Sequence, residues 1–381
     1  MGEVHWRELK REVVDKGLCT GCAACVMACP KDVLGYTDEY LPEQIGEGMA
    51  HDQCAYGDKG CDICTRACPR FRSWEADIDE VLFGRPRTDD EVFGQYRSVL
   101  LCRTTDHGIA EVGQDGGLVA SLLVWGLENE RIDGALTAQV VNDVRGPFDA
   151  GPRLVKSRED VLLTAGSSYT YSPNPLAMQD AQAAGLAKVA LVGMSCQASI
   201  TGALDAYGVN KYKNKIGLTV GLMCSKTFTY EGQKIVLQEH DIDIADVIRA
   251  NIKGVFQVWT RDGRYREIPL KEFHPYTRPG CKLCPDFSAQ HADISTGGIG
   301  SNDGWTLTVV RTARGEEWMR GVIDQGWIEA RPGEEDPVAM NLLRKLSKMS
   351  RKRWPSGDDA RTTRPAALPL VSWQPPSVGT T

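Results

Sequence analysis

The sequence predicts an α+β/α/β protein in which a small, cysteine-rich N-terminal domain precedes a larger α/β domain. Eight of the 13 cysteines fall within the first 70 residues, in two runs that end alike. From residue 98 onwards, apolar segments typical of strands alternate with segments typical of helices. The length of 381 residues also exceeds the roughly 100–200 residues of one typical domain.

The first run of cysteines is Cys19-x2-Cys22-x2-Cys25-x3-Cys29, followed by a proline. This spacing is that of two-cluster bacterial ferredoxins. In those proteins three thiolates hold one 4Fe-4S cluster and the fourth reaches the other cluster. Residues 1–70 are therefore expected to form a ferredoxin-like head.

The second run is Cys54-x6-Cys61-x2-Cys64-x3-Cys68, again followed by a proline. It repeats the end of the first run, with its first cysteine set further back. We expect one cluster on Cys19, Cys22, Cys25 and Cys68, and a second on Cys54, Cys61, Cys64 and Cys29. The alternative is a pair of zinc knuckles, which do not have this paired spacing.

The composition narrows the class of protein. It is 42% hydrophobic and 25% charged, with a net charge of −7, so no overall basic field favours nucleic acid. No apolar run approaches the roughly 20 residues that span a bilayer, and the N-terminus lacks the apolar core of a signal peptide. We therefore expect a cytoplasmic protein whose clustered thiols bind metal.

The elements of the chain follow in order. Residues 71–96 are charged and interrupted by glycine and proline, which predicts a linker with helical pieces. Strands are expected at 98–105, 135–141, 187–199 and 215–225, and the third of these runs into a turn. A helix is expected at 118–130 and a hairpin at 255–268. This alternation predicts a sheet with partly parallel strands.

Four more cysteines lie in this α/β region. Cys196 and Cys224 each lie at the end of a predicted strand, and Cys281 and Cys284 form a C-x2-C pair. Sites in α/β sheets gather at the carboxyl ends of strands, so these thiols could converge on a third cluster. From spacing alone, core packing is an equal alternative for the first two. Cys102 lies in mid-strand and is expected in the core.

Five segments of this region resemble, in sequence order, the beta subunit of coenzyme F-420-reducing hydrogenases and its relatives. They are QDGG (114–117), AGSSYTYSPN (165–174), LVGMSCQA (191–198), GLMCS (221–225) and RPGCKLCPDFSAQHADISTGGIGSNDGW (278–305). The relatives include F-420-linked dehydrogenase subunits, deazaflavin-oxidising respiratory subunits and 7-hydroxymethyl chlorophyll a reductase. The resemblance covers residues 98–312.

The resemblance implies a catalytic domain over residues 97–335. It also implies one bound FAD, a docking site for F-420, and a third 4Fe-4S cluster on Cys196, Cys224, Cys281 and Cys284. Two departures could change the flavin contacts or the substrate. This chain has Met194-Ser195 where the family more often has Thr-Pro, and Lys226-Thr227 where it often has Glu-Asn.

The FAD is expected among polar and glycine-rich segments. The candidate contacts are Gly116, Gly117, Ser167, Ser168, Tyr169, Asn174, Lys253, Gly297, Gly298 and Gly300. Gly116 and Gly117 precede a predicted helix whose free amides suit a phosphate, and Lys253 could stabilise reduced flavin. A tight turn is the commoner role for a glycine pair, and a solvated position for a lysine. No catalytic side chain is assigned otherwise, because the FAD carries the chemistry.

Two basic segments could meet anionic partners. Lys211, Lys213 and Lys215 are candidates for the anionic tail of F-420, with a solvated loop as the alternative. Residues 336–354 predict a basic amphipathic helix that either seats an anionic partner or membrane surface, or remains solvated. Residues 355–381 predict a disordered tail.

The expected function is an oxidoreductase. It would exchange hydride between F-420 and FAD and pass single electrons through three clusters, to or from a partner subunit or ferredoxin. An alternative keeps FAD and the clusters but reduces a small organic substrate, as the chlorophyll a reductase relatives do. A further alternative is a non-catalytic electron relay. Peripheral membrane association through a partner complex stays open.

Overall fold

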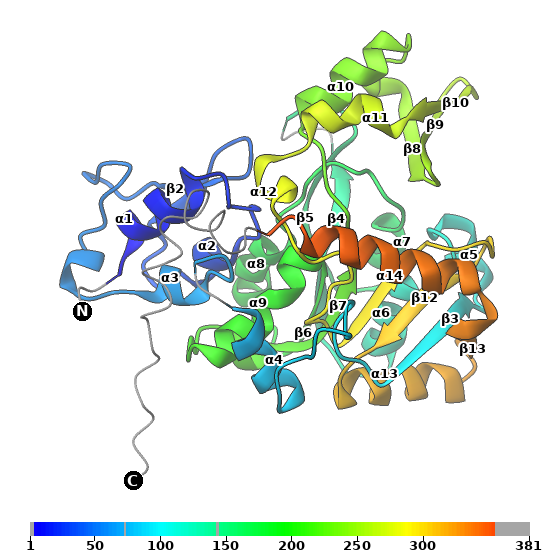
Figure 1. Cartoon of the computed structure of the whole chain (residues 1–381), viewed down its shortest axis with the longest axis horizontal. Helices are drawn as coiled ribbons and strands as arrows, with labels where there is room; N and C mark the ends of the chain where they lie inside the picture. Colours follow the sequence, from blue (N-terminus) through cyan, green and yellow to red (C-terminus); the bar gives the residue numbers. More distant parts are fainter. Residues whose placement is uncertain (1–3, 72–73, 142–144, 355–381) are drawn as a thin grey trace.

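A computed structural model describes residues 4–71, 74–141 and 145–354 of the chain. It has a small N-terminal head, a central eight-stranded sheet covered by helices, and a separate three-stranded sheet (Figure 1). The head lies beside the central domain, and the three-stranded sheet projects from the central domain. The predicted tail at 355–381 lies outside the described residues.

The head consists of short elements around its cysteines. They are α1 (Trp6–Leu9), a π-helical turn (Lys10–Val14), α2 (Ala24–Ala28), β1 (Leu34–Tyr36), β2 (Pro42–Gln44), a 3-10 turn (Gly57–Lys59) and α3 (Ile63–Ala67). The helices α2 and α3 end at Cys29 and Cys68, where the following proline cannot continue a helix. Trp6, Leu9 and Phe71 belong to the apolar core beneath them.

The central sheet is mixed, as the sequence predicts. Its strands are β3 (Ser98–Thr104), β4 (Gly134–Val141), β5 (Asp149–Val155), β6 (Val189–Met194), β7 (Ile216–Leu222), β11 (Ile294–Gly297), β12 (Thr306–Val310) and β13 (Ile328–Pro332). Their order is β13-β3-β12-β11-β7-β6-β4-β5. The strands β11, β7, β6 and β4 pair in parallel, and the outer strands pair antiparallel. The carboxyl ends of the parallel strands therefore share one edge.

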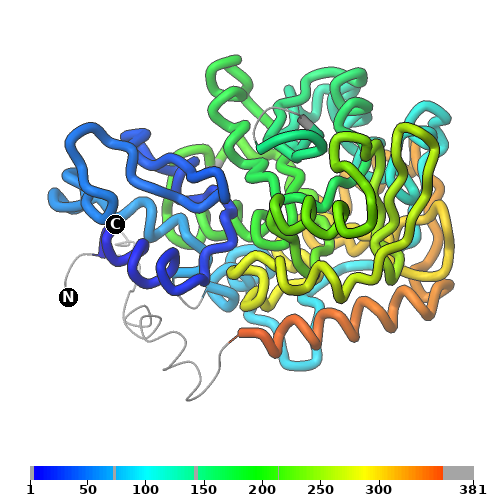
Figure 2. Tube along the Cα trace, turned by 90° about the horizontal axis from the view of Figure 1, so that it is seen from above, coloured from blue at the N-terminus to red at the C-terminus, as the bar shows by residue number. Residues whose placement is uncertain are grey.

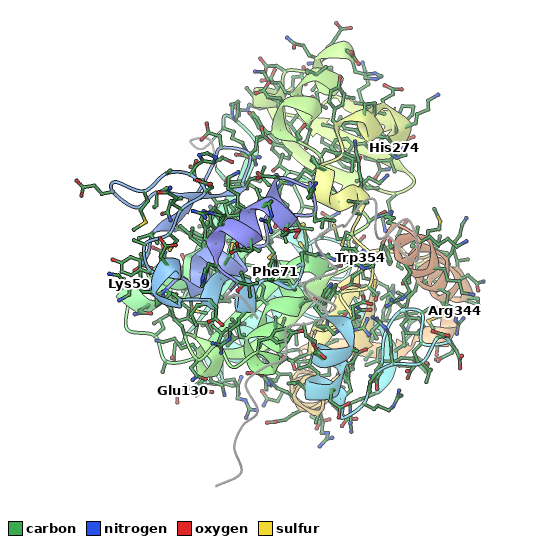
Figure 3. The ribbon with its side chains drawn as sticks, turned by 60° about the vertical axis from the view of Figure 1, so that its left-hand side comes forward. Lys59, Phe71, Glu130, His274, Arg344 and Trp354 are labelled. Carbon is green, nitrogen blue, oxygen red and sulfur yellow. The ribbon has the colours of Figure 1, made fainter. Side chains whose placement is uncertain are left out.

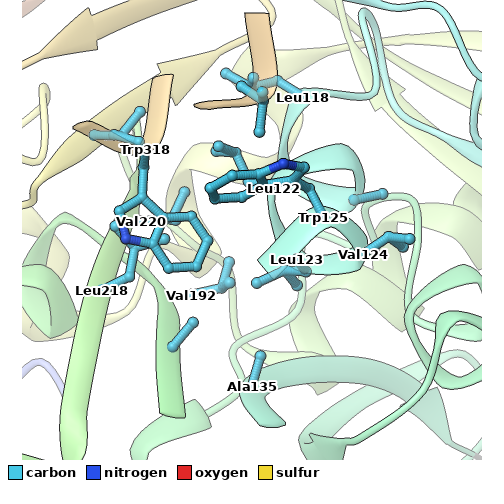
Figure 4. Close-up of a cluster of buried hydrophobic side chains, with 14 of the residues drawn as sticks. Leu118, Leu122, Leu123, Val124, Trp125, Ala135, Val192, Leu218, Val220 and Trp318 are labelled. Carbon is cyan, nitrogen blue, oxygen red and sulfur yellow. The ribbon is translucent and has the colours of Figure 1, made fainter. Parts of the chain in front are cut away.

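One face of the sheet packs on four helices. These are α5 (His107–Val112), α6 (Leu118–Glu128), α7 (Arg158–Leu163) and α13 (Ala313–Asp324). Because side chains alternate along a strand, Leu218 and Val220 of β7 point to this face together. They lie under the indoles of Trp125 and Trp318, which meet edge to face at 5.2 Å (Figure 4). Cys102 belongs to this core, as predicted.

The other face carries α8 (Met178–Ala183), α9 (Ser195–Ala206) and α14 (Pro337–Arg351). The head packs here too, since its residues Met27 and Tyr40 share a core with Ile200 and Leu204 of α9. The predicted basic helix is α14, and it runs along one side of the body with its end towards the head (Figure 2).

The three-stranded sheet is antiparallel and contains the predicted hairpin. Its strands are β8 (Val247–Ile252), β9 (Val255–Thr260) and β10 (Tyr265–Pro269), accompanied by α10 (Tyr230–Glu239) and α11 (Leu270–Phe273). The short helix α12 (Pro279–Lys282) follows and lies against the head. Gly263 in the hairpin turn has φ of +83°, a conformation that favours glycine. Within the described part of the chain, no helix has the length and apolarity needed to cross a bilayer.

One segment differs in detail from the prediction, and the predicted linker contains a helical piece as expected. The strand expected at 187–199 ends at Met194, and α9 begins at once rather than after a turn. The Gln197 side chain accepts a hydrogen bond from the Met194 amide, which caps this helix. In the predicted linker, α4 (Glu75–Phe83) packs on α9, because Gly202 has no Cβ and leaves room for Ile78.

Candidate iron-sulfur and cofactor sites

The head brings three cysteines of the first run together with the last cysteine of the second. Cys25 is the buried member of this group with the clearest change in pKa. Burial raises the pKa of its thiol, and negative charge on Cys68, Cys19 and Cys22 raises the pKa further. Four thiolates this close together need positive charge between them, which bound iron would supply.

The other four head cysteines line a second hollow. Its volume is about 340 Å³, and its walls include Cys29, Cys54, Cys61 and Cys64. Burial raises the pKa of the Cys64 thiol, with further increases from the charges of the other three. Trp6 and Leu34 close the hollow on its apolar side. Cys54 and Cys61 are partly exposed, so this group faces the outside of the molecule.

A third group forms where the body meets the head. A hollow of about 280 Å³ is lined by Cys196, Cys224, Cys281 and Cys284. Cys196 lies in the first turn of α9, and Cys224 follows β7. Cys281 lies in α12, and Cys284 shortly follows it. Three segments far apart in the sequence thus deliver four thiols to one place.

The donor sets suit a four-iron cluster better than a single ion. Among residues 4–71, 74–141 and 145–354, no three histidine, cysteine or carboxylate side chains are placed to hold one metal ion. A zinc site requires that, because its thiolates all lie ~2.3 Å from one ion. A cubane spreads four thiolates around four irons. Two of the groups each line one hollow with four thiols, which is the number of thiolates that a cubane binds, so the residues present fit the cubane there.

Polar and cationic side chains contact the sulfurs of the third group. The Tyr171 hydroxyl lies 3.9 Å from Cys196 Sγ, and the Thr227 hydroxyl lies 3.5 Å from Cys281 Sγ. Arg70, from the head, donates a hydrogen bond of 3.0 Å to Cys284 Sγ. Such contacts to cluster ligands tune reduction potential.

The third group lies directly beside the first. A Cβ on Gly280 would be 2.1 Å from the backbone oxygen of Cys19, so the two cysteine loops touch. Thr20 of the head lines the third hollow. Arg278 reinforces the contact by donating to the carbonyl of Glu39 at 2.8 Å.

Three of the expected FAD segments also converge. Lys253 Nζ lies 2.9 Å from Asp115 Oδ1 and donates to the carbonyl of Gly298 at 3.2 Å. Gly298 has no room for a Cβ because the Asp115 carboxylate fills it. Gly297 packs against Met223, which precedes Cys224. The convergence lies at the carboxyl ends of β7 and β11, next to the third cysteine group.

Unpaired polar atoms lie within these segments. The Gln114 side-chain nitrogen and the Thr296 hydroxyl are buried and have no hydrogen-bond partner among the described residues. Gly254, next to Lys253, faces open space. A cofactor with many polar groups, such as FAD, could satisfy such atoms.

The other expected FAD contacts have internal partners. Gly116 donates its amide to the Thr306 hydroxyl, and Gly117 donates to the carbonyl of Gln114. The Tyr169 hydroxyl accepts from the amide of Ile252, beside Lys253.

The remaining candidate residues lie around these segments. Ser167 and Ser168 precede Tyr169 in the same loop. Asn174 is buried and donates to the carbonyl of Val192, which ties its loop to β6. Gly300 has φ of +123° and packs on Asp336.

The structure places the proposed tail-binding lysines on the head side of the body. Lys211 donates to the backbone carbonyl of Cys29 at 2.5 Å and lies 3.4 Å from Asp32. Lys215 donates to the carbonyl of Leu186. Both ammonium groups thus have internal partners. Lys213 lies in a 3-10 turn between them.

Asp115, Arg70 and Arg278 are residues of these sites that the sequence did not single out. Asp115 was visible only as part of a glycine-rich motif. Arg70 could have been noticed in the sequence, because it is a charged residue that directly follows Cys68 and Pro69 and precedes an apolar residue. Arg278 shows its role only once the head is docked on the body.

Three family profiles match the chain. Residues 99–179 match the N-terminal part, and residues 186–336 the C-terminal part, of the coenzyme F-420 hydrogenase/dehydrogenase beta subunit. Residues 12–34 match a 4Fe-4S binding domain.

Individual relatives agree with these profiles. The beta subunit of the coenzyme F-420 hydrogenase of Methanococcus voltae is 33% identical over 264 residues, which cover 68% of this chain and 93% of that protein. A subunit of the F-420H2 dehydrogenase of Methanosarcina mazei is 29% identical over 351 residues, which cover 90% of this chain and 91% of that protein. A chain of the F-420-reducing [NiFe] hydrogenase complex from Methanosarcina barkeri superposes with a TM-score of 0.66 at 33% identity, covering 72% of this chain and 94% of that one.

Proposed function

The chain belongs to the family of coenzyme F-420 hydrogenase/dehydrogenase beta subunits, and we propose that it exchanges hydride between F-420 and a bound FAD and passes single electrons through three 4Fe-4S clusters. It is an oxidoreductase of F-420-related iron-sulfur electron transfer. The proposed architecture is a two-cluster head over residues 1–70, a linker at 71–96 and a catalytic domain over 97–335.

One observation carries the proposal. Cys196, Cys224, Cys281 and Cys284 line one hollow, and the contact of Lys253 with Asp115 lies beside it at the same edge of the sheet. Cysteines suited to hold a cluster, which transfers single electrons, thus lie next to residues suited to hold a polar organic cofactor. Both are needed in an enzyme that converts a hydride into separate electrons.

The chain's own residues have distinct roles in this proposal. The Lys253 ammonium, paired with Asp115, lies beside the glycine segment, where it would be available to reduced flavin. Gln114 and Thr296 offer polar partners that nothing else in the described chain occupies. When bound, FAD would supply the exchange between two-electron and one-electron chemistry.

The contacts between cysteine groups support an order for electron transfer. The third group touches the first through Gly280 and Cys19. In the proposed assignment, the first and second groups each take one cysteine, Cys68 or Cys29, from the other's run. The second group is partly exposed through Cys54 and Cys61, which suits it to face a partner subunit or ferredoxin.

A second candidate function keeps the cofactors but changes the substrate. Met194, Ser195, Lys226 and Thr227, at which this chain departs from the common family pattern, all line the third hollow. Because these four residues differ from the common family pattern, the alternative is that the substrate is a small organic molecule other than F-420.

An anaerobic assay separates the two functions. Purified protein with bound clusters and flavin is mixed with reduced F-420 and a one-electron dye, and the deazaflavin absorbance and the dye are followed together. We expect two dye molecules reduced for each F-420 oxidised, since hydride carries two electrons. A protein that holds FAD and clusters but leaves F-420 unchanged in both directions would contradict the F-420 function and favour the second candidate.

A further inference from the structure

Arg70 is a buried cation between two of the cysteine groups. The residue is 2% exposed, and its Nη2 donates to Cys284 Sγ at 3.0 Å. Its guanidinium carbon lies 5.0 Å from the centroid of Trp74 and 5.4 Å from that of Trp354. The two indoles leave little room for water around the charge.

Most of the hydrogen-bonding capacity of Arg70 is unused. Its Nε and Nη1 are buried and have no hydrogen-bond partner among the described residues. In that part of the chain Arg70 also forms no ion pair with a carboxylate. An isolated buried charge is costly, so a guanidinium persists in such a place only beside compensating negative charge. The cysteine groups are the main neighbouring source of that charge.

Arg311 shows the ordinary way to bury an arginine in this fold. It is also 2% exposed, but it donates to the Ser295 hydroxyl and to the carbonyls of Gln95 and Ser288. Burial lowers the pKa of Arg311 to about 10. Arg70 is equally buried, but the hydrogen bond that it donates goes to the Cys284 sulfur rather than to a hydroxyl or a carbonyl.

We propose that Arg70 is a positioning residue for electron transfer, whose charge and N–H donors hold the third cluster at a higher reduction potential than its cysteines alone would set. The inference rests on the proposed third cluster. Reduction adds one electron, and so one negative charge, to a cluster. A fixed positive charge and hydrogen bonds to the sulfurs therefore favour the reduced state.

The position of Arg70 lets its charge act on the proposed path of electron transfer. Arg70 directly follows Cys68 and Pro69 of the first group and donates to Cys284 of the third, so its charge lies between neighbouring groups on the proposed electron path. Trp354, just beyond the end of α14, packs against the head core that contains Phe71 (Figure 3). With water excluded, the charge of Arg70 is weakly screened and acts strongly on the clusters.

Potentiometric titration followed by EPR tests the proposal. The protein variants are Arg70→Gln, Arg70→Lys and, as a matched buried arginine, Arg311→Lys. Iron content is measured first, and the third cluster is identified as the signal that Cys281→Ser removes. We expect Arg70→Gln to shift the midpoint potential of this cluster to more negative values. Arg70→Lys keeps the charge but loses the planar fork of donors, and should shift the potential less in the same direction.

The control variant and the Arg70 variants should give different results. Arg311→Lys should lower the melting temperature and leave every cluster potential unchanged. Full iron content with an unshifted potential in Arg70→Gln overturns the proposal. If Arg70→Gln does not assemble, an unshifted potential in Arg70→Lys overturns it. If the wild-type protein holds only two clusters, the proposed third cluster fails and this inference fails with it.

Discussion

The α-carbon of Gly280 lies against the backbone carbonyl of Cys19, with room for no Cβ between them. Cys19 belongs to the first cysteine group in the head, and Gly280 precedes Cys281 of the third group in the body. The two loops that would hold neighbouring clusters are thus in direct backbone contact. The backbone of Gly280 lies outside the left-handed region, so only space requires glycine there.

Replacing Gly280 with alanine should separate head and body. The new Cβ would be 2.1 Å from a carbonyl oxygen, which cannot rotate away as a flexible side chain can. We expect a loss of ~1–3 kcal/mol in unfolding free energy, as for other overpacked sites. Electron transfer between flavin and head clusters should slow as well, as measured by stopped-flow reduction.

Gly108 provides the matched control for this variant. A Cβ at Gly108 would be 3.4 Å from its nearest neighbour, which is an ordinary contact, and Gly108 lies in α5. Gly108→Ala should therefore leave both stability and transfer rate near those of the wild type. Equal behaviour of the two variants would show that the Gly280 contact is unimportant.

Iron content tests the third cysteine group. Since each 4Fe-4S cluster takes four thiolates, the wild-type protein should hold about 12 irons and Cys281→Ser about eight. The control is Cys102→Ala, because Cys102 is buried in mid-strand on the opposite face of β3 from the head. Near-equal iron in wild type and Cys281→Ser would remove the third cluster.

Local spacing explains why the sequence alone could indicate a 4Fe-4S binding segment in the head. The cysteines of a run are only a few residues apart, so the proposed exchange of Cys29 and Cys68 between two clusters is a prediction from the pattern alone. The third group needed the family resemblance, because Cys196, Cys224 and Cys281 come together only when β6, β7 and α12 are assembled. Strand order, which is not local, decides that assembly.

Interactions between distant segments account for what the sequence did not predict. The helix α4 was expected within a linker, yet Ile78 packs into the space that Gly202 leaves on α9. Lys211 seemed free to bind an anion, but the head supplies the carbonyl of Cys29 to it. Neither partner is near in sequence, so no pattern along the chain reports them.

Asp336 should stabilise the protein in a pH-dependent way. It is buried and accepts from the amides of Ser301, Asn302 and Ala339, which ties the glycine loop to α14. Burial raises its pKa, but these amides outweigh burial and leave the pKa below 3.8. The ionised form is thus favoured by folding, and its contribution is complete above the ordinary pKa and lost as pH falls through the lowered one.

Asp336→Asn and Asp336→Ala separate charge from capping. Asparagine still caps α14, so it should lose less stability than alanine, for which we expect ~2 kcal/mol. Because the titration lies in the acid range, both penalties should stay constant between about pH 5 and pH 8 in denaturant unfolding. A penalty that varies across neutral pH would assign the effect to another group.

Lys253 should contribute to flavin binding rather than to folding. Its ammonium is partly exposed, and it joins Asp115 to the carbonyl of Gly298 at the proposed flavin site. A hydrogen bond from a charged group contributes ~1.5–3 kcal/mol, so Lys253→Met should bind FAD roughly 10- to 100-fold more weakly. Flavin release and rebinding, followed by fluorescence, measure this directly.

Lys211→Met is the control for the loss of a lysine, because Lys211 contacts the head at Cys29. It should retain FAD, and its iron content shows whether the second group is intact. If Lys253→Met binds FAD as tightly as the wild type and Lys211→Met does not, the flavin lies on the head side and the proposed site at Asp115 is wrong. If only Lys253→Met loses flavin at full iron content, the cofactor lies beside the third cluster. That position is needed for a hydride taken from F-420 to leave as single electrons.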